Sequence, residues 1–280
     1  MMKNILVPVD FSKPSENALH VAVELAKDND AKITILHVME LAESVFGSTQ
    51  FNIADDNIIF FMKLAKKKFD DFLDQDFLND VEHVDIVDVG PTAQVIIKNV
   101  EKQNADIVVM GSTGASKSII DDVFVGSNTE KLVGGTDVPV LVVKDQMKNF
   151  NIKNVLFGSN FKEESIPAFN KAKDFAESFS ANLKLLYINQ PGNQFKSSTE
   201  IYEQMRSFLH HTKTPINNQN IIIHSDYSLK EGVINAAKSY KADLITITTR
   251  GNSGFAHYFT GSVADEVVRD STLPVLTFKI

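Results

Sequence analysis

The sequence predicts two tandem doubly wound α/β domains, over residues 1–146 and 151–280. One observation is an internal repeat: the segment 5–12 returns as 155–162, and a glycine-rich segment late in the first half is echoed late in the second. Another is that short apolar segments alternate with segments of helical periodicity, as in a parallel sheet that helices cover on both faces. The length agrees, because 280 residues at roughly 100–200 per domain suit two domains.

The first half begins with a strand, and short runs rich in β-branched residues mark the strands that follow. They cover 4–9, 33–38, 106–110 and 138–143, with a further strand that ends near Asp88. Residues 15–27 and 91–103 carry apolar side chains three and four positions apart, which predicts amphipathic helices. Within 46–79 one helical face carries apolar residues, which predicts a helix packed on the core and leaves a partner-binding surface as the alternative. That face consists of Ile58, Phe61, Ala65, Phe69 and Phe72.

The second half repeats the same order of elements. We expect strands at 153–159, 183–188, 220–226, 243–248 and 274–279, and helices at 164–180, 197–211, 229–240 and 262–270. The joining segment is short and polar, so the domains should pack closely. The last strand of each half is apolar although it ends its sheet, and an exposed apolar edge needs a partner.

Composition excludes several functional classes. The chain has no cysteine, so disulfides, thiol nucleophiles and thiolate metal sites are absent, and its histidines lack metal-site spacing. A formal net charge of −8 argues against binding to nucleic acid, which requires a positively charged surface. No apolar run approaches the ~20 residues that span a membrane, and a strand close to the N-terminus leaves no room for a leader peptide. We therefore expect a cytoplasmic protein that binds neither nucleic acid nor membrane.

Each half pairs a polar residue after its first strand with a glycine-rich loop after its fourth. In doubly wound sheets, ligands bind beyond the carboxyl ends of the strands, where Asp10 and Gly111 should meet. Glycines there let backbone N–H groups approach phosphates, and Ser127 and Asn128 are expected to open the next helix, whose N-terminus favours an anion. A carboxylate at Asp10 would accept hydrogen bonds from sugar hydroxyls or a base amine. Asp88 and Asp226, after the third strands, either cap loops or border this crevice.

These motifs resemble the universal stress protein family in its tandem form. The resemblance rests on the segments Val7-Pro8-Val9-Asp10, Val109-Met110-Gly111-Ser112-Thr113-Gly114, Gly126-Ser127-Asn128-Thr129-Glu130 and Val138-Pro139-Val140-Leu141-Val142-Val143. It implies five-stranded parallel domains of the adenine nucleotide alpha hydrolase-like fold. It also implies an internal pseudo-dimer through the final strands, and a further homodimer is left open.

In one branch of that family the glycine loop binds ATP, and the resemblance implies the residues that would do so here. Asp10 would meet ribose or adenine, the Val38 backbone would lie by the base, Met110 and Gly111 would line the ribose side, and Gly114 would help to hold the phosphates. The implied set is Pro8, Val9, Asp10, Val38, Met110, Gly111, Gly114, Gly126, Ser127 and Asn128, with Asn160, Gly251, Gly254, Gly261 and Ser262 in the second half.

Both halves depart from the family pattern, which places nine residues between the second glycine and the Gly-Ser pair. In the first half eleven residues, 115–125, separate Gly114 from Gly126 and include two aspartates that would repel a triphosphate unless a cation such as Mg²⁺ bridges them. In the second half, the repeated Gly-x-x-Gly motif leaves only six residues between Gly254 and Gly261, and Asn160 replaces the carboxylate of Asp10. We therefore expect the first domain to be the better nucleotide site.

The leading functional hypothesis is a cytoplasmic stress-response protein that binds ATP or a related adenine nucleotide as a regulatory ligand and signals to a protein partner that the sequence does not identify. No catalytic residue is expected, because the chain lacks the lysine-bearing loop of a true nucleotide hydrolase, and Ser127 and Ser262 suit helix caps better than nucleophiles. One alternative is a nucleotide-independent scaffold. Another is slow hydrolysis or phosphotransfer, for which the sequence shows no water-activating group.

Overall fold

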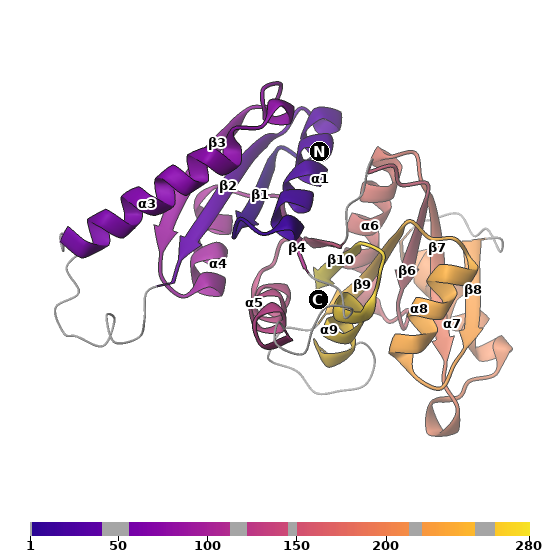
Figure 1. The fold of residues 1–280 in the computed structure, drawn as a ribbon. Coiled ribbons are helices and arrows are strands. Elements are labelled where there is room, and N and C mark those ends of the chain that lie inside the picture. Colours follow the sequence, from indigo (N-terminus) through magenta and orange to yellow (C-terminus); the bar gives the residue numbers. More distant parts are fainter. Residues whose placement is uncertain (1, 41–55, 113–121, 145–149, 213–219, 250–260) are drawn as a thin grey trace.

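The computed structural model describes residues 2–40, 56–112, 122–144, 150–212, 220–249 and 261–280. Within these residues ten strands form one continuous sheet in the order β3-β2-β1-β4-β5-β10-β9-β6-β7-β8. Helices lie against both faces of each half of the sheet (Figure 1). The predicted doubly wound α/β architecture with two similar halves is confirmed.

The first half follows the predicted order, with all of its strands parallel. Its elements are β1 (Asn4–Val9), α1 (Lys13–Asn29), β2 (Lys32–Met39), α3 (Asp56–Leu73), η1 (Asp76–Leu78), β3 (His83–Val89), α4 (Thr92–Lys102), β4 (Ile107–Gly111), α5 (Asp122–Gly135) and β5 (Val140–Val143). Ser12 caps α1 by accepting a hydrogen bond from the N–H of Ser15, and Pro14 stands in its first turn, where no intrahelical N–H bond is lost.

The second half repeats this plan and is also parallel throughout. Its elements are β6 (Asn154–Gly158), η2 (Glu163–Ser165), α6 (Ile166–Ser178), β7 (Asn182–Asn189), η3 (Gly192–Gln194), α7 (Ser198–His211), β8 (Ile221–Ser225), α8 (Leu229–Ser239), β9 (Leu244–Thr249), α9 (Gly261–Asp270) and β10 (Val275–Lys279). Ser197 and Glu200 form a capping box at the start of α7, which satisfies two backbone N–H groups at that end.

Two hydrophobic cores lie on opposite faces of the sheet. Successive residues of a strand point to opposite faces, so Ile5 and Val7 of β1 enter one core while Leu6 enters the other. The first core is closed by α1, α3, α6 and α7, and the second by α4, α5, α8 and α9. This two-faced burial explains why the strands read as nearly continuous apolar runs.

The two halves join through their last strands. β5 and β10 pair antiparallel, with Leu141 opposite Leu276, Val142 opposite Val275 and Val140 opposite Thr277. The pairing covers both apolar edges and relates the halves by a pseudo-two-fold axis that passes beside the Leu141–Leu276 pair. The internal pseudo-dimer implied by the family resemblance is confirmed, and α5 and α9 lie side by side at the junction (Figure 1).

The long helix α3 packs on the sheet through its C-terminal part. Phe69 is fully buried in the first core and Phe72 packs against it, as the helical periodicity predicts. Farther toward its start, Phe60 and Leu64 are 59% and 49% exposed, and α3 extends beyond the sheet (Figure 1). The side chains of Ile58 and Phe61, on the predicted core face, lie outside the described residues.

The glycine-serine pairs stand differently at the starts of α5 and α9. α9 opens at Gly261, as expected from the sequence. α5 already begins at Asp122, so Gly126, Ser127 and Asn128 lie in its second turn and the expectation that they open the helix was wrong. An aspartate in the first turn interacts favourably with the helix dipole, which favours the earlier start.

Candidate functional site

The topology places a crevice at the carboxyl ends of β1 and β4. The chain leaves β1 toward β2 on one side and returns on the other side at β4, which is the switch point where ligands bind in doubly wound sheets. Asp10 directly follows β1, and Gly111 is the last residue of β4. The second half has its own switch point between β6 and β9, with Asn160 just beyond β6.

Asp10 presents a carboxylate to solvent at this edge. Its Oδ1 atom accepts a hydrogen bond of 2.9 Å from the backbone N–H of Ser12, and its own N–H donates to the Ser15 hydroxyl at 3.4 Å. Partial burial opposes ionisation, but hydrogen bonds from the side chain and backbone of Ser12, and from Ser15, outweigh it and lower the pKa of Asp10. The site therefore offers a charged hydrogen-bond acceptor at neutral pH.

The residue after each of these polar side chains has a left-handed backbone. Phe11 has φ of 66° and Phe161 has φ of 54°, a conformation that costs a bulky residue of order 1–3 kcal/mol. The turn directs each ring into the core, where Phe11 lies 4.2 Å from the ring of His37 and Phe161 stacks 6.3 Å from Tyr187. Sequence reasoning missed this strained turn, although the repeat of a phenylalanine after Asp10 and Asn160 was its signal.

Gly111 allows the first turn of α1 to lie directly against the end of β4. A Cβ atom added at this position would be 2.1 Å from the carbonyl oxygen of Pro14 and 2.7 Å from the nitrogen of Ser15. Any larger residue would push the start of α1, and with it the serines that hold Asp10, away from the strand. The glycine thus sets the width of the crevice, which is the role of close backbone approach.

Strand register corrects the match between the two glycine loops. β1 aligns Ile5 with Ile107 of β4, and β6 aligns the corresponding Val155 with Leu244 of β9. Counting along these strands places Thr248 at the position of Gly111. Counting on along the sequence matches Gly251 with Gly114. The sequence match of Gly111 with Gly251 was therefore wrong by three residues. The second Gly-x-x-Gly motif, residues 251–254, begins three residues after Thr248, which is the true counterpart of Gly111.

The corrected register changes the comparison of loop lengths. Nine residues, 252–260, separate Gly251 from Gly261, which is the spacing implied by the family resemblance. The six-residue spacing in the second half came from the earlier alignment of the sequence, and Gly254 falls within these nine residues. Gly114, Gly251 and Gly254 themselves lie outside the described residues.

In the second half the residue that corresponds to Asp10 is buried. Asn160 is 8% exposed, and its amide oxygen accepts a hydrogen bond of 3.1 Å from the N–H of Lys162, which repeats the turn at Asp10. Its backbone carbonyl accepts a hydrogen bond of 2.6 Å from the side chain of Gln204 on α7. Phe69 of α3 and Phe208 of α7 are equivalent, because each ring contacts the phenylalanine that follows Asp10 or Asn160. Four residues before them, α3 therefore has Ala65 where α7 has Gln204. Ala65 cannot make this bond, and Asp10 stays more open.

The remaining predicted residues of the first half lie along the same edge. Val9 is buried at the end of β1, where its carbonyl oxygen is 2.9 Å from Nδ1 of His37. Val38 is half-buried near the end of β2, and Met110 is buried on β4 beside Gly111. Pro8 and Asn128 are half-buried, whereas only the backbone is described for Gly126, Ser127, Gly261 and Ser262.

A buried lysine behind the crevice was not found from the sequence. Lys144 is 3% exposed and donates hydrogen bonds to the hydroxyl of Ser112 at 3.3 Å and to the carbonyl oxygen of Arg269 at 3.4 Å. It connects the residue after β4 with the last turn of α9, so it joins the candidate site to the other domain. Its place in the polar linker gave no sequence signal of burial.

Asp88 and Asp226 are loop caps in both halves. Each accepts a hydrogen bond of 3.0 Å from an asparagine of the following helix, Asn99 or Asn235, and a second bond from the next backbone N–H. These bonds join the ends of the third strands to the helices that follow, as expected of a capping role. Across the described residues there is no cluster of three potential metal ligands, and no helix in that part of the chain is long and apolar enough to cross a membrane.

Comparison with known proteins agrees with this duplicated architecture. The chain is 29% identical to the universal stress protein MJ0531 of Methanocaldococcus jannaschii over 158 residues, 53% of this chain and 85% of that protein. It is 30% identical to the universal stress protein MJ0577 of the same organism over 161 residues, 51% of this chain and 96% of that protein.

Solved structures extend the likeness to both halves. A universal stress protein from Archaeoglobus fulgidus matches 99% of this chain and 96% of its own with a TM-score of 0.72 at 20% identity, which shows the fold. The model of the universal stress protein family matches residues 1–144 and again residues 151–279. The chain therefore belongs to the universal stress protein family and carries the family domain twice.

Proposed function

We propose that the first domain binds ATP or a related adenine nucleotide as a regulatory ligand, without efficient turnover, in the cytoplasm. The observation that carries the proposal is the ionised, exposed carboxylate of Asp10 at the switch point beside Gly111. A carboxylate is a strong acceptor for ribose hydroxyls, and the absence of a side chain at Gly111 lets a ligand approach the backbone. The family resemblance supplies the nucleotide, since the matching motif binds ATP in one branch.

The electrostatics of the site favour binding over catalysis. A general base is most effective when its pKa lies near the working pH, whereas donors hold the pKa of Asp10 below its ordinary value. Asp10 is therefore suited to hold a sugar and is a weak acceptor for the proton of an attacking water. Lys144 adds a positive charge behind Ser112 that would favour an anionic ligand, and Mg²⁺ would offset repulsion from Asp121 and from Asp122 at the start of α5.

The second domain is proposed to bind nucleotide less well in spite of its family-like loop length. Asn160 is buried, and its amide carries no charge. Thr248 also adds a side chain where the first domain has Gly111. Nucleotide would then occupy the first crevice more than the second. We infer that the first domain responds to nucleotide, while the second supports the pseudo-dimer and a protein partner.

The test is to denature freshly purified protein and identify any released nucleotide by chromatography and mass spectrometry. The proposal expects an adenine nucleotide at up to one equivalent per chain, or saturable ATP binding by calorimetry in the presence of Mg²⁺. Neither released nucleotide nor titration heat at several temperatures would contradict it.

A nucleotide-independent scaffold is the second candidate. It is favoured by α3, which presents Phe60 and Leu64 at 59% and 49% exposure beyond the sheet. The two functions are distinguished by Leu64→Lys and Asp10→Asn in a cellular stress assay. A scaffold would lose function with the first substitution alone, whereas a nucleotide sensor would lose it with the second.

A further inference from the structure

A pocket of about 680 Å³ lies at the domain junction, on the sheet edge opposite the Asp10 crevice of the first domain. It is bordered by the C-terminal end of α1, by α6, and by the amino ends of β4 and β5, with β10 alongside. The apolar part of its lining includes Ile107, Pro139, Phe175, Leu276 and Phe278. Its volume falls in the range of sites that bind small molecules or short peptide segments.

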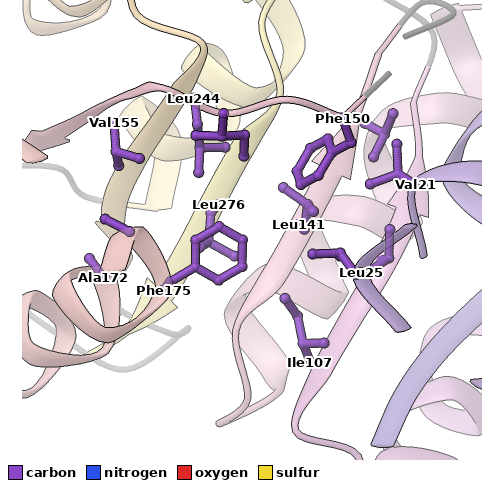
Figure 2. Close-up of a cluster of buried hydrophobic side chains, with 14 of the residues drawn as sticks. Val21, Leu25, Ile107, Leu141, Phe150, Val155, Ala172, Phe175, Leu244 and Leu276 are labelled. Atoms are coloured by element: carbon purple, nitrogen blue, oxygen red, sulfur yellow. The ribbon is translucent and has the colours of Figure 1, made fainter. Parts of the chain in front are cut away.

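The pseudo-two-fold axis relates this pocket to an equivalent region on the other side of the junction, and there a side chain of the protein itself occupies the space. On that side Phe150, from the segment between the domains, is 5% exposed, with its ring 5.8 Å from that of Phe179. Its backbone N–H donates a hydrogen bond to the carboxylate of Glu24. Figure 2 shows Phe150 beside Val21, at the end of a row of buried side chains that crosses the junction.

The residues around Phe150 have counterparts that line the open pocket. Asp174 on α6 corresponds to Glu24 on α1, and Asn29 corresponds to Phe179. Met2 at the pocket corresponds to Ile152, which is 2% exposed two residues after Phe150. The open pocket therefore reproduces the binding place of Phe150, including a carboxylate positioned to accept a backbone N–H.

The pocket differs from its filled counterpart in charge. Four aspartates and one lysine line it: Asp28, Asp106, Asp137, Asp174 and Lys171. Asp106 already accepts hydrogen bonds from the N–H groups of Lys3 and Asn4, and Asp137 forms an ion pair of 2.9 Å with Lys279. Asp28 and Asp174 border the pocket from different helices. Their charges favour a cationic occupant over a neutral or anionic one.

We propose that this pocket binds a short extended segment of a partner protein in which an aromatic side chain is flanked by lysine or arginine. The ring would occupy the apolar lining, a backbone N–H would donate to Asp174, and the basic side chains would approach Asp28 and Asp174. A peptide is favoured over a free organic cation because a stretch of this chain occupies the equivalent place through Phe150 and Ile152. In the sequence these two residues stand within Lys-Asn-Phe-Asn-Ile-Lys, residues 148–153. The proposal does not depend on nucleotide binding.

The probe is a labelled peptide of that sequence with blocked ends, titrated with the full chain and followed by fluorescence anisotropy. We expect saturable binding that weakens as salt is added, because charge pairs contribute to it. Replacing the peptide's phenylalanine with alanine should weaken binding by about tenfold or more, because the aromatic anchor is lost. The protein substitution Asp174→Lys should weaken it by a similar factor, and Asp28→Lys should do so independently.

The matched control is Glu203→Lys, which makes the same charge change at an exposed position of α7. It should leave the peptide affinity unchanged, and all three variants should keep the thermal midpoint of the wild type, because their side chains are exposed. The proposal is overturned if the peptide does not bind at millimolar concentrations, if Asp174→Lys binds it as well as the wild type does, or if phenethylamine binds as tightly as the peptide.

Discussion

Asp10 and Asn160 occupy the same turn in the two halves, and each accepts a hydrogen bond from the backbone N–H two residues later, at 2.9 Å and 3.1 Å. The side-chain oxygen therefore supports the turn whether or not the group is charged. What distinguishes the two residues is exposure and charge, because Asp10 is open to solvent and Asn160 is 8% exposed. Structure and ligand binding can thus be separated by exchanging the two side chains.

Gly111→Ala should destabilise the protein by roughly 1–3 kcal/mol, because the new methyl group would overlap the backbone of Pro14 at 2.1 Å. Urea unfolding measures the change in the free energy of unfolding. Gly135→Ala is the matched control, since its added Cβ meets only the flexible end of the Ile97 side chain at 2.7 Å. Equal costs at the two positions would contradict the assigned contact between α1 and β4.

Phe150→Ala should cost about 3–5 kcal/mol of stability, because the ring is 5% exposed in the junction core. Phe195→Ala should change stability by less than about 0.5 kcal/mol, since that ring is 64% exposed. Chemical denaturation of both variants checks the difference. A small effect at Phe150 would mean that the joining segment does not hold the two halves together.

Asp265 should make stability depend on pH. Burial, and then repulsion from its pseudo-symmetric partner Glu130 across the α5–α9 contact, raise its pKa to about 6 from an ordinary 3.8. Because the folded pKa lies above the unfolded one, the carboxyl costs no stability below about pH 4. The cost then grows as pH rises to about 6 and stays constant above it.

Asp265→Asn should therefore increase the free energy of unfolding at neutral pH by about 1 kcal/mol, after allowance for solvent screening of a partly exposed group. The gain should shrink toward zero below about pH 4. Unfolding curves over this pH range measure the gain, and Asp174→Asn at an exposed position is the control. Asp243→Asn would not serve as a control, because the Asp243 side chain accepts a hydrogen bond from the backbone N–H at the start of β6. A gain that does not vary with pH would contradict the raised pKa.

Lys144→Met should lower stability by about 1–3 kcal/mol, because it removes the hydrogen bonds that the buried ammonium donates to the carbonyl oxygen of Arg269 and to the hydroxyl of Ser112. Thermal unfolding measures the loss, and Lys102→Met at an exposed position is the control. ATP affinity should fall as well, because the positive charge behind the crevice is lost. Unchanged stability would show that other groups satisfy these two acceptors.

The order of strands and helices along the chain, and the burial of the sheet on both faces, could be predicted from the sequence, because strands buried on two faces read as apolar runs and the apolar residues of a helix recur every three to four positions. Register could not be obtained in the same way. The Gly-x-x-Gly motif can be aligned in two ways three residues apart, and only the pairing of β9 with β6 shows that Thr248 stands where β4 has Gly111.

Other features of the site depend on tertiary contacts that residue patterns do not record. The left-handed backbone at Phe11 and Phe161 is unfavourable for a phenylalanine and persists because the rings are packed below the turn. Phe150 and Lys144 stand in a stretch that reads as a polar linker, yet both are buried at the junction. Sequence patterns predict burial from the average character of a stretch of residues, whereas here single residues within a polar stretch are buried by tertiary contacts.

The most direct test of the central claim is an ATP titration, with Mg²⁺, of the wild type, Asp10→Asn and Asn160→Asp. Asp10→Asn keeps the turn and removes the charge, so the protein should still fold and should bind ATP about 10–100-fold more weakly, the worth of a hydrogen bond to a charged group. Asn160→Asp should leave the affinity unchanged, because that side chain is buried. Wild-type affinity in Asp10→Asn, or loss of binding in the Asn160 variant alone, would contradict the assignment of the nucleotide site to the first domain.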